Sequence, residues 1–151
     1  MDLATLNHER LDHANLTVVD IDRAVAFLTT ALPGWRVRGQ GRMDWFGTPI
    51  RWLHVGNDDS YLALQDGGQG APMDWRSRRI GVKHLGITVP DLDAVVQRLA
   101  AAGWAMDHPG GTHPHRRSAY YVADELVQIE FMQYLSAQPE QRNDYVWQPQ
   151  P

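Results

Sequence analysis

Two histidines occupy the same place in two similar stretches of the chain. The stretch LDHANLTVVDIDRAVAFLTTALPGW, residues 11–35, carries His13, and VKHLGITVPDLDAVVQRLAAAGW, residues 82–104, carries His84. A neutral imidazole can bind a metal ion, pass a proton near pH 7 or accept a hydrogen bond. A single histidine on a strand is more often an ordinary core or surface residue. The duplication is therefore what favours a functional interpretation.

The two stretches align at a spacing of 71 residues, which places His13 over His84. The matched pairs include Thr17 with Thr88, Val18 with Val89, Asp20 with Asp91, Asp22 with Asp93, Val25 with Val96, and Leu28 with Leu99. Each copy predicts a strand, an aspartate that caps a helix, and an amphipathic helix closed by Gly34 or Gly103. The helix residues expected to be buried are Ala24, Val25, Phe27, Leu28 and Ala31 in the first copy, and Val95, Val96, Leu99 and Ala102 in the second.

The segments that follow the two helices are typical of β-strands. RWLHVGNDDSYLALQD and SAYYVADELVQIEFMQY both alternate apolar and polar residues, with a short polar turn at GNDD and at ADEL. Such a pattern predicts hairpins. We therefore expect an α+β fold of two tandem βαβββ modules. The expected boundaries are an N-terminal segment 1–10, a first module 11–66, a linker 67–80, a second module 81–135 and a C-terminal tail 136–151.

The alternation of side chains along each strand predicts where the polar residues point. In the first strand His13, Asn15 and Thr17 share one face, while Ala14, Leu16 and Val18 share the other and must cover the helix. His84 and Thr88 lie likewise on the polar face of the second copy. The last strand of each copy adds Gln65 and Glu130 to that face. Buried polar groups need water, a hydrogen-bond partner or a metal.

Composition excludes several classes of protein. The chain has 151 residues and a formal net charge of −4, so no basic field attracts nucleic acid. It has no cysteine, so any metal must be bound through nitrogen and oxygen. No apolar run reaches membrane-spanning length, and the polar start MDLATLNHERL does not resemble a signal peptide. We expect a cytoplasmic protein with small-molecule or protein partners, and no nucleic acid or membrane partner.

These residues resemble the vicinal oxygen chelate superfamily, which includes glyoxalases, bleomycin resistance proteins and ring-cleaving dioxygenases. The resemblance covers roughly residues 11–135. It implies that the two modules form a cup-shaped, curved mixed sheet with helices outside, around a divalent ion. The family's metal ligands come from the first and last strands of each module, which implies His13, Gln65, His84 and Glu130 as the ligands here.

The chemistry of these residue types agrees with the resemblance. Imidazole and carboxylate groups suit Fe²⁺, Ni²⁺, Zn²⁺ or Mn²⁺, and two histidines with one carboxylate occur in non-haem iron oxygenases. A metal with open positions can bind two adjacent oxygens of a small substrate and stabilise charge on them. Gln65 is the weakest of the four candidates, since amides are poor ligands beside carboxylates. It could line the pocket or bind a water instead.

A polar loop, DHPGGTHPHRRSAYY, precedes the strand that carries Glu130. Its residues are either a surface hairpin or part of the site. In the second interpretation His113, His115 or Tyr120 assists acid–base steps, and Arg116 or Arg117 pairs with a substrate carboxylate. Ring-cleaving members of the superfamily use a His and a Tyr in this general region.

Three functions are consistent with the sequence. The leading hypothesis is a glyoxalase-like isomerase or lyase, in which Glu130 moves a proton between adjacent carbons of an enediolate. The first alternative is an extradiol dioxygenase that uses Fe²⁺ on His13, His84 and Glu130. The second alternative is a protein that binds a small molecule without chemistry, as antibiotic-resistance members do.

The assembly follows from the same resemblance. The cup is closed either by the two modules of one chain or by modules from two chains. Glyoxalase I of similar length builds each site across a dimer. The resemblance therefore predicts a homodimer in which His13 and Gln65 of one subunit meet His84 and Glu130 of the other. Edge strands and an apolar tail around Trp147 also favour a partner.

Overall fold

The computed structural model describes residues 9–123 and 126–148. Part of the expected N-terminal segment, two residues of the ADEL turn and the end of the tail lie outside these ranges. The elements in chain order are β1 (His13–Thr17), α2 (Ile21–Ala31), β2 (Arg36–Trp45), β3 (Thr48–Gly56), β4 (Tyr61–Gln65), β5 (His84–Thr88), α3 (Leu92–Ala101), β6 (His108–Pro109), β7 (Arg116–Tyr121), β8 (Gln128–Tyr134) and α4 (Pro139–Arg142).

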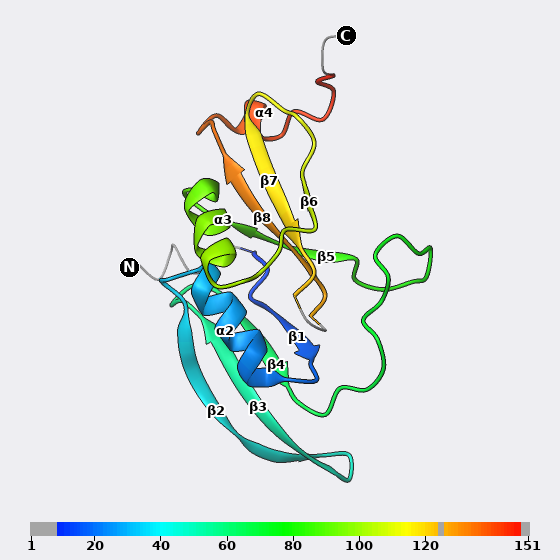
Figure 1. Cartoon of the computed structure of the whole chain (residues 1–151). Helices are drawn as coiled ribbons and strands as arrows, with labels where there is room; N and C mark the ends of the chain where they lie inside the picture. The colour runs from blue at the N-terminus through cyan, green and yellow to red at the C-terminus, as the bar shows by residue number, and fades with distance from the viewer. Residues whose placement is uncertain (1–8, 124–125, 149–151) are drawn as a thin grey trace.

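The chain forms two four-stranded sheets with the same topology (Figure 1). The strand orders are β1-β4-β3-β2 in sheet A and β5-β8-β7-β6 in sheet B. The pairs β1 with β4 and β5 with β8 are parallel, and the other strand pairs are antiparallel. The prediction of two tandem βαβββ modules in an α+β fold is confirmed.

The strand faces agree with the alternation of the sequence. Leu62 and Leu64 of β4, and Ile129 and Phe131 of β8, are buried in the core beneath the helices. The polar residues of β1 and β5, His13 and His84 among them, are exposed. Each sheet thus has an apolar face against a helix and a polar face on the other side.

Both helices begin at the predicted aspartates. The Asp20 side chain accepts a hydrogen bond from the Arg23 backbone N–H, and Asp91 accepts one from Ala94. Ala24, Phe27, Leu28, Ala31, Val95 and Leu99 are buried as predicted, while Val25 and Val96 are half-buried. Ala102 is exposed, so the prediction that it would be buried was wrong. It is the C-cap residue of α3 and lies beyond the last turn that faces the core.

The two helices end differently. Gly103 has a φ of 84°, and the Trp104 N–H donates to the Leu99 carbonyl, so this glycine closes α3 in the left-handed conformation. Gly34 is not among the residues with positive φ; α2 ends instead at the C-cap Leu32, whose N–H donates to Leu28. The second glycine cap is confirmed, and the first is wrong.

The modules meet through their helices. α2 and α3 are in contact and share one hydrophobic core, in which the Phe27 ring lies 5.2 Å edge-on from the Trp104 ring. Arg98 of α3 donates to the carbonyls of Thr30 and Ala31 at the C-terminal end of α2. A cation at that helix end is favourable. Because this contact involves the apolar sides, it leaves the two polar sheet faces separate.

Residues 66–83 connect the modules without helix or strand. Figure 1 shows this segment as a long excursion away from the two sheets before it enters β5. Among the described residues, no helix combines the length and apolar character needed to cross a bilayer.

Candidate metal centre

The polar face of sheet B brings His84 and Glu130 together. His84 extends from β5 and Glu130 from the neighbouring β8, and His84 Nε2 lies 3.3 Å from Glu130 Oε2. The carboxylate side chain is only 11% exposed, whereas the imidazole is 42% exposed. Gly86, opposite Glu130 in the sheet, has no side chain to crowd the carboxylate. This pair offers one nitrogen and one oxygen donor to a cation.

Tyr120 holds the other oxygen of the same carboxylate. It lies opposite Glu130 on β7, and its hydroxyl donates to Glu130 Oε1 at 2.7 Å. Burial, together with this hydrogen bond and the negative charge of Glu130, raises the pKa of Tyr120 to about 12. The phenol therefore keeps its proton at neutral pH and acts as a fixed donor beside the carboxylate.

The Tyr120 ring packs against a stack of two further rings. The His108 ring of β6 lies 4.4 Å from the Tyr120 ring at 8°, and Trp75 of the connecting segment lies 5.0 Å from His108. The Asp107 carboxylate fixes His108 through Nδ1 at 2.7 Å. No local sequence pattern marks Trp75 or Asp107, because their contacts form only when segments far apart in the chain come together.

The polar face of sheet A holds His13 and Gln65 in other contacts. His13 Nδ1 lies 2.9 Å from Asp12 Oδ2, and its ring stacks on Tyr61 at 4.8 Å. The hydrogen bond to His13 lowers the pKa of Asp12 below its usual value. Gln65 donates through Nε2 to Thr17 Oγ1 at 3.0 Å. This hydrogen bond does not involve the amide oxygen, which is the atom that a cation would bind.

Strand register shows which residue of module one corresponds to Glu130. In sheet B, His84 pairs with Gln128, and Glu130 is two residues further along β8. In sheet A, His13 pairs with Tyr61, so the residue two further along β4 is Ala63.

Gln65 lies another two residues on. Four residues of strand span about 13 Å, against about 7 Å for two. Gln65 pairs with Thr17, as Met132 pairs with Thr88, so its equivalent is Met132. The role of Gln65 as a metal ligand remains a prediction. The strand register argues against it, because Gln65 does not occupy the position of Glu130.

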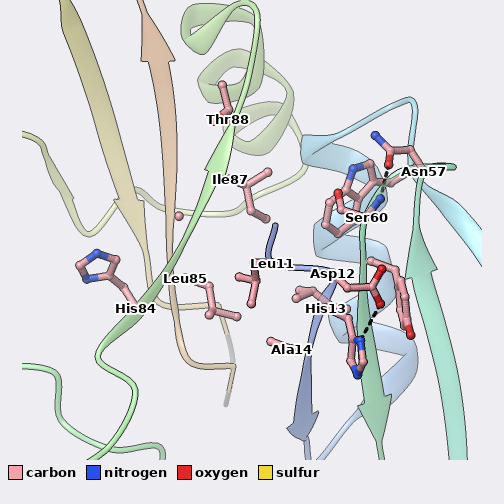
Figure 2. A pocket seen from close by; sticks show the side chains of 14 residues that line it. Leu11, Asp12, His13, Ala14, Asn57, Ser60, His84, Leu85, Ile87 and Thr88 are labelled. Atoms are coloured by element: carbon pink, nitrogen blue, oxygen red, sulfur yellow. Dashed lines mark hydrogen bonds and ion pairs between the residues drawn. The ribbon is translucent and has the colours of Figure 1, made fainter. Parts of the chain in front are cut away.

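The chain does not bring His13 together with His84 and Glu130. Among residues 9–123 and 126–148, no group of three or more His, Asp or Glu side chains is placed to hold a metal ion. A cavity of about 540 Å³ lies between β1 and β5 and is lined by both His13 and His84. Figure 2 shows, however, that the His84 ring projects from the side of β5 away from β1 and His13. Each histidine belongs to its own sheet face.

The loop before β7 contributes to a second cavity. His113, Tyr120 and Glu130 all line a space of about 320 Å³. The His113 side chain is 9% exposed. The His115 backbone N–H donates to His113 Nδ1, which places the proton on Nε2. That Nε2 is buried, makes no hydrogen bond in the described part of the chain, and lies 4.0 Å from Asp144 Oδ2. His115 thus orients His113 through its backbone.

Both arginines of the loop are engaged within the chain. Arg117 donates to the Asp93 carboxylate at 2.8 and 3.1 Å and to Gln133. Arg116 donates to the backbone carbonyls of Arg142 and Asp144, and so holds the C-terminal segment against β7. These contacts give both arginines a structural role within the chain. Whether one of them also binds a substrate carboxylate stays a prediction.

The family of the chain follows from a comparison of its sequence with family models. Residues 10–126 match the model described as Glyoxalase/Bleomycin resistance protein/Dioxygenase superfamily. The chain belongs to this superfamily. The match covers the first module and the second as far as residue 126, so it includes both histidines but ends before β8. A comparison with curated protein sequences gives no match.

Solved structures of the superfamily share the fold. A glyoxylase/bleomycin resistance protein/dioxygenase domain from Frankia sp. EAN1pec has 24% identity and a TM-score of 0.69 over 91% of this chain and all of that one. The fosfomycin resistance protein FosX from Listeria monocytogenes, complexed with Mn(II) and sulfate, has 17% identity and a TM-score of 0.63 over 91% and 99%. Trypanothione-dependent glyoxalase I from Leishmania major has 19% identity and a TM-score of 0.61 over 83% and 87%.

The donor set suits the divalent ions that this superfamily binds in some members. His84 and Glu130 converge on one point from two strands, and His13 is a further exposed imidazole on the matching strand of the repeat. Two imidazoles and one carboxylate fit Mn²⁺, Fe²⁺, Ni²⁺ or Zn²⁺. Asp12 would orient His13, since ligating histidines commonly donate their second N–H to a carboxylate.

Proposed function

We propose that the chain is a divalent-metal-dependent enzyme whose site has three protein ligands, His84 and Glu130 of one chain and His13 of a second copy. The contact between His84 Nε2 and Glu130 Oε2 on the polar face of sheet B carries the proposal. The separation of the two sheet faces supports assembly across a homodimer, because each chain presents one half-site on each face. In this arrangement Gln65 is a bystander.

The proposed substrate is a small molecule with two adjacent oxygens. A bound divalent ion supplies Lewis acidity, which stabilises negative charge on such oxygens. Three protein ligands leave room for both oxygens. The superfamily membership supports this substrate class.

The proposed reaction is a proton transfer of the glyoxalase-like isomerase or lyase type. Glu130 would take a proton from one carbon and return it to its neighbour, with Tyr120 fixed at its second oxygen by a 2.7 Å hydrogen bond. His113, which lines the 320 Å³ cavity together with Glu130, would assist the proton transfer. His115 would hold His113 in the required tautomer. Trp75 and His108 would keep the Tyr120 ring in place.

A second candidate is extradiol ring cleavage with Fe²⁺. One observation favours it: module one has Ala63 at the position equivalent to Glu130, so this position supplies no second carboxylate. The remaining set of two histidines and one carboxylate is the one found in non-haem iron oxygenases.

Metal titration tests the site. Chelator-treated protein is titrated with Mn²⁺, Ni²⁺, Zn²⁺ and, without oxygen, Fe²⁺, in a calorimeter. We expect one ion per proposed site, that is, one per chain, and its loss in His84→Ala at an unchanged melting temperature, because His84 faces away from the core. A His84→Ala protein that keeps stoichiometric metal would overturn the assignment.

Subunit mixing tests the shared site. His13→Ala and His84→Ala proteins are unfolded together, refolded and isolated as hybrid dimers. In a hybrid, one of the two sites recovers all its ligands, so half of the wild-type metal content should return. Verified hybrids that bind no metal would place each site within one chain.

Substrate assays separate the two reactions. Oxygen uptake is measured with simple catechols and the Fe²⁺-loaded protein, and isomerisation with a hemithioacetal and each metal. Turnover of the hemithioacetal without oxygen uptake supports the isomerase. Oxygen uptake supports ring cleavage. A metal-loaded protein that binds substrates of both kinds and turns over neither would favour the non-catalytic binding function.

A further inference from the structure

Sheet A carries a continuous layer of four rings on its polar face, which we call the aromatic face. Trp52 contacts His54 at 5.1 Å, His54 contacts Tyr61 at 4.7 Å, and Tyr61 contacts His13 at 4.8 Å. These residues come from β3, β4 and β1 and lie opposite the helix-covered side. Trp52, His54 and Tyr61 are half-buried and lie outside the hydrophobic core.

Two glycines of β2 let the largest ring lie flat. Gly41 pairs with Trp52 and Gly39 pairs with His54, so β2 has no side chain at either position of this face. A Cβ on Gly41 would stand 3.0 Å from the Trp52 ring, and one on Gly39 would stand 4.0 Å from it. The indole therefore packs one face on the β2 backbone and turns the other outward. Such an arrangement forms a floor for a planar molecule.

A β-bulge adds a cation to this face. The register between β2 and β3 shifts between Val37 and Gly39, so Arg38 is the extra residue without a cross-strand partner. Bulges re-aim side chains near functional sites. The Arg38 guanidinium lies 4.5 Å over the Tyr61 ring. Among the described residues Arg38 forms no ion pair within 4.0 Å, unlike its neighbour Arg36, which pairs with Asp58. Its charge contributes to the lowered pKa values of Asp12 and Asp58, so a bound anion would compete with these two carboxylates.

We propose that the aromatic face binds a planar aromatic anion, with the ring on the Trp52 indole and the carboxylate on Arg38. The charge of Arg38 complements the carboxylate, and the indole face complements an aromatic ring, with the His54 ring beside it at 53° to the indole. This inference rests on the proposed function in one respect, because His13, the proposed metal ligand, ends the row of rings. The face would hold the aromatic part of the substrate while its adjacent oxygens reach the metal.

The test uses a matched pair of probes on the full-length, chelator-treated protein. 1-Naphthoate and its saturated analogue, decahydronaphthalene-1-carboxylate, have the same charge but differ in planarity. Binding is followed by calorimetry and by the indole N–H signals in a nitrogen-correlated proton spectrum. We expect the naphthoate to bind at least tenfold more tightly and to shift the Trp52 signal.

Matched variants separate the two contributions. Trp52→Leu, which keeps apolar volume but removes the ring, and Arg38→Ala should each weaken naphthoate binding at least fivefold. Trp45→Leu and Arg42→Ala are the controls, since Trp45 lies near the β2–β3 turn and Arg42 alternates to the opposite face of β2. Melting temperatures verify folding.

Two results would overturn the inference. One is equal affinity for the two probes, or naphthoate binding that Trp52→Leu and Arg38→Ala leave intact. The other is a change of sedimentation coefficient in those variants without probes and with no loss of probe binding, which would mean that Trp52 and Arg38 serve the contact between two copies and not a ligand. His84→Ala distinguishes this inference from the metal proposal, because it should lose the metal and keep the naphthoate.

Discussion

The two modules share one topology but differ in what their polar faces carry. Sheet B presents a buried carboxylate held by His84 and Tyr120, whereas sheet A presents rings, glycines and a bulged arginine. At the position equivalent to Glu130, sheet A has Ala63. Duplication therefore preserved the scaffold and the histidine, while the neighbouring positions diverged. In the proposed site one module supplies acid–base groups, and the other supplies one ligand and a binding surface.

The largest expected difference between the modules lies in metal affinity. Glu130→Ala should weaken metal binding more than 100-fold, about 2.7 kcal/mol, because a charged ligand is lost. Gln65→Ala should change the affinity less than twofold, because the register places Gln65 outside the ligand set. Calorimetric titration with Mn²⁺ measures both. Equal losses in the two variants would restore Gln65 as a ligand.

A carboxylate can be added to module one to test the register directly. Ala63→Glu should tighten metal binding about tenfold, about 1.4 kcal/mol, because it places a carboxylate where sheet B has Glu130. Gln65→Glu adds the same charge two residues away and should have a smaller effect. The same titration compares them. A larger gain from Gln65→Glu would contradict the equivalence of Ala63 and Glu130.

Tyr120→Phe tests the carboxylate partner that sheet B has and sheet A lacks. At neutral pH the variant should lose about 1–2 kcal/mol of stability with the hydrogen bond to Glu130. The folded pKa of Tyr120 is about 12, above the unfolded value near 10. Folding thus favours the protonated phenol, so this stability is complete below pH 10 and declines as the pH rises towards 12.

Thermal melts of metal-free protein from pH 8 to pH 11 measure this effect. The gap between wild type and Tyr120→Phe should narrow at the alkaline end. Tyr145→Phe, at an 81% exposed position, is the control. A gap that stays constant or widens would show that the phenol does not keep its proton in the folded state.

The smallest expected effect concerns the two helix ends. Gly103→Ala should cost about 1 kcal/mol, because alanine is strained at a φ of 84°. Gly34→Ala should be close to neutral, since Gly34 is not among the residues with positive φ and a Cβ there meets no atom within 4 Å. Urea unfolding measures both. A similar cost at Gly34 would mean that its conformation depends on glycine after all.

The sequence by itself determined the repeated strand and helix pattern and the face on which His13, His84 and Glu130 lie. These features depend on local periodicity, which a single strand or helix already contains. The aspartate caps of both helices are local too, because each aspartate accepts a hydrogen bond from a backbone N–H three residues along the chain. Aligning Leu62-Ala63-Leu64 with Ile129-Glu130-Phe131 by their alternation would also have identified Ala63, but Ala63 has no donor atom, so the polar Gln65 on the same face was predicted as the ligand instead.

Only the tertiary structure decided which residues of different strands stand together. The pairing of Tyr61 with His13 fixes the place of Gln65, and it depends on turn lengths and on the packing of β4 between its neighbours. The stack of Trp75, His108 and Tyr120 joins segments far apart in sequence. The packing of α2 on α3 separates the polar faces, because apolar helix surface is buried wherever complementary surface is available. Such non-local choices leave no periodic trace in the sequence.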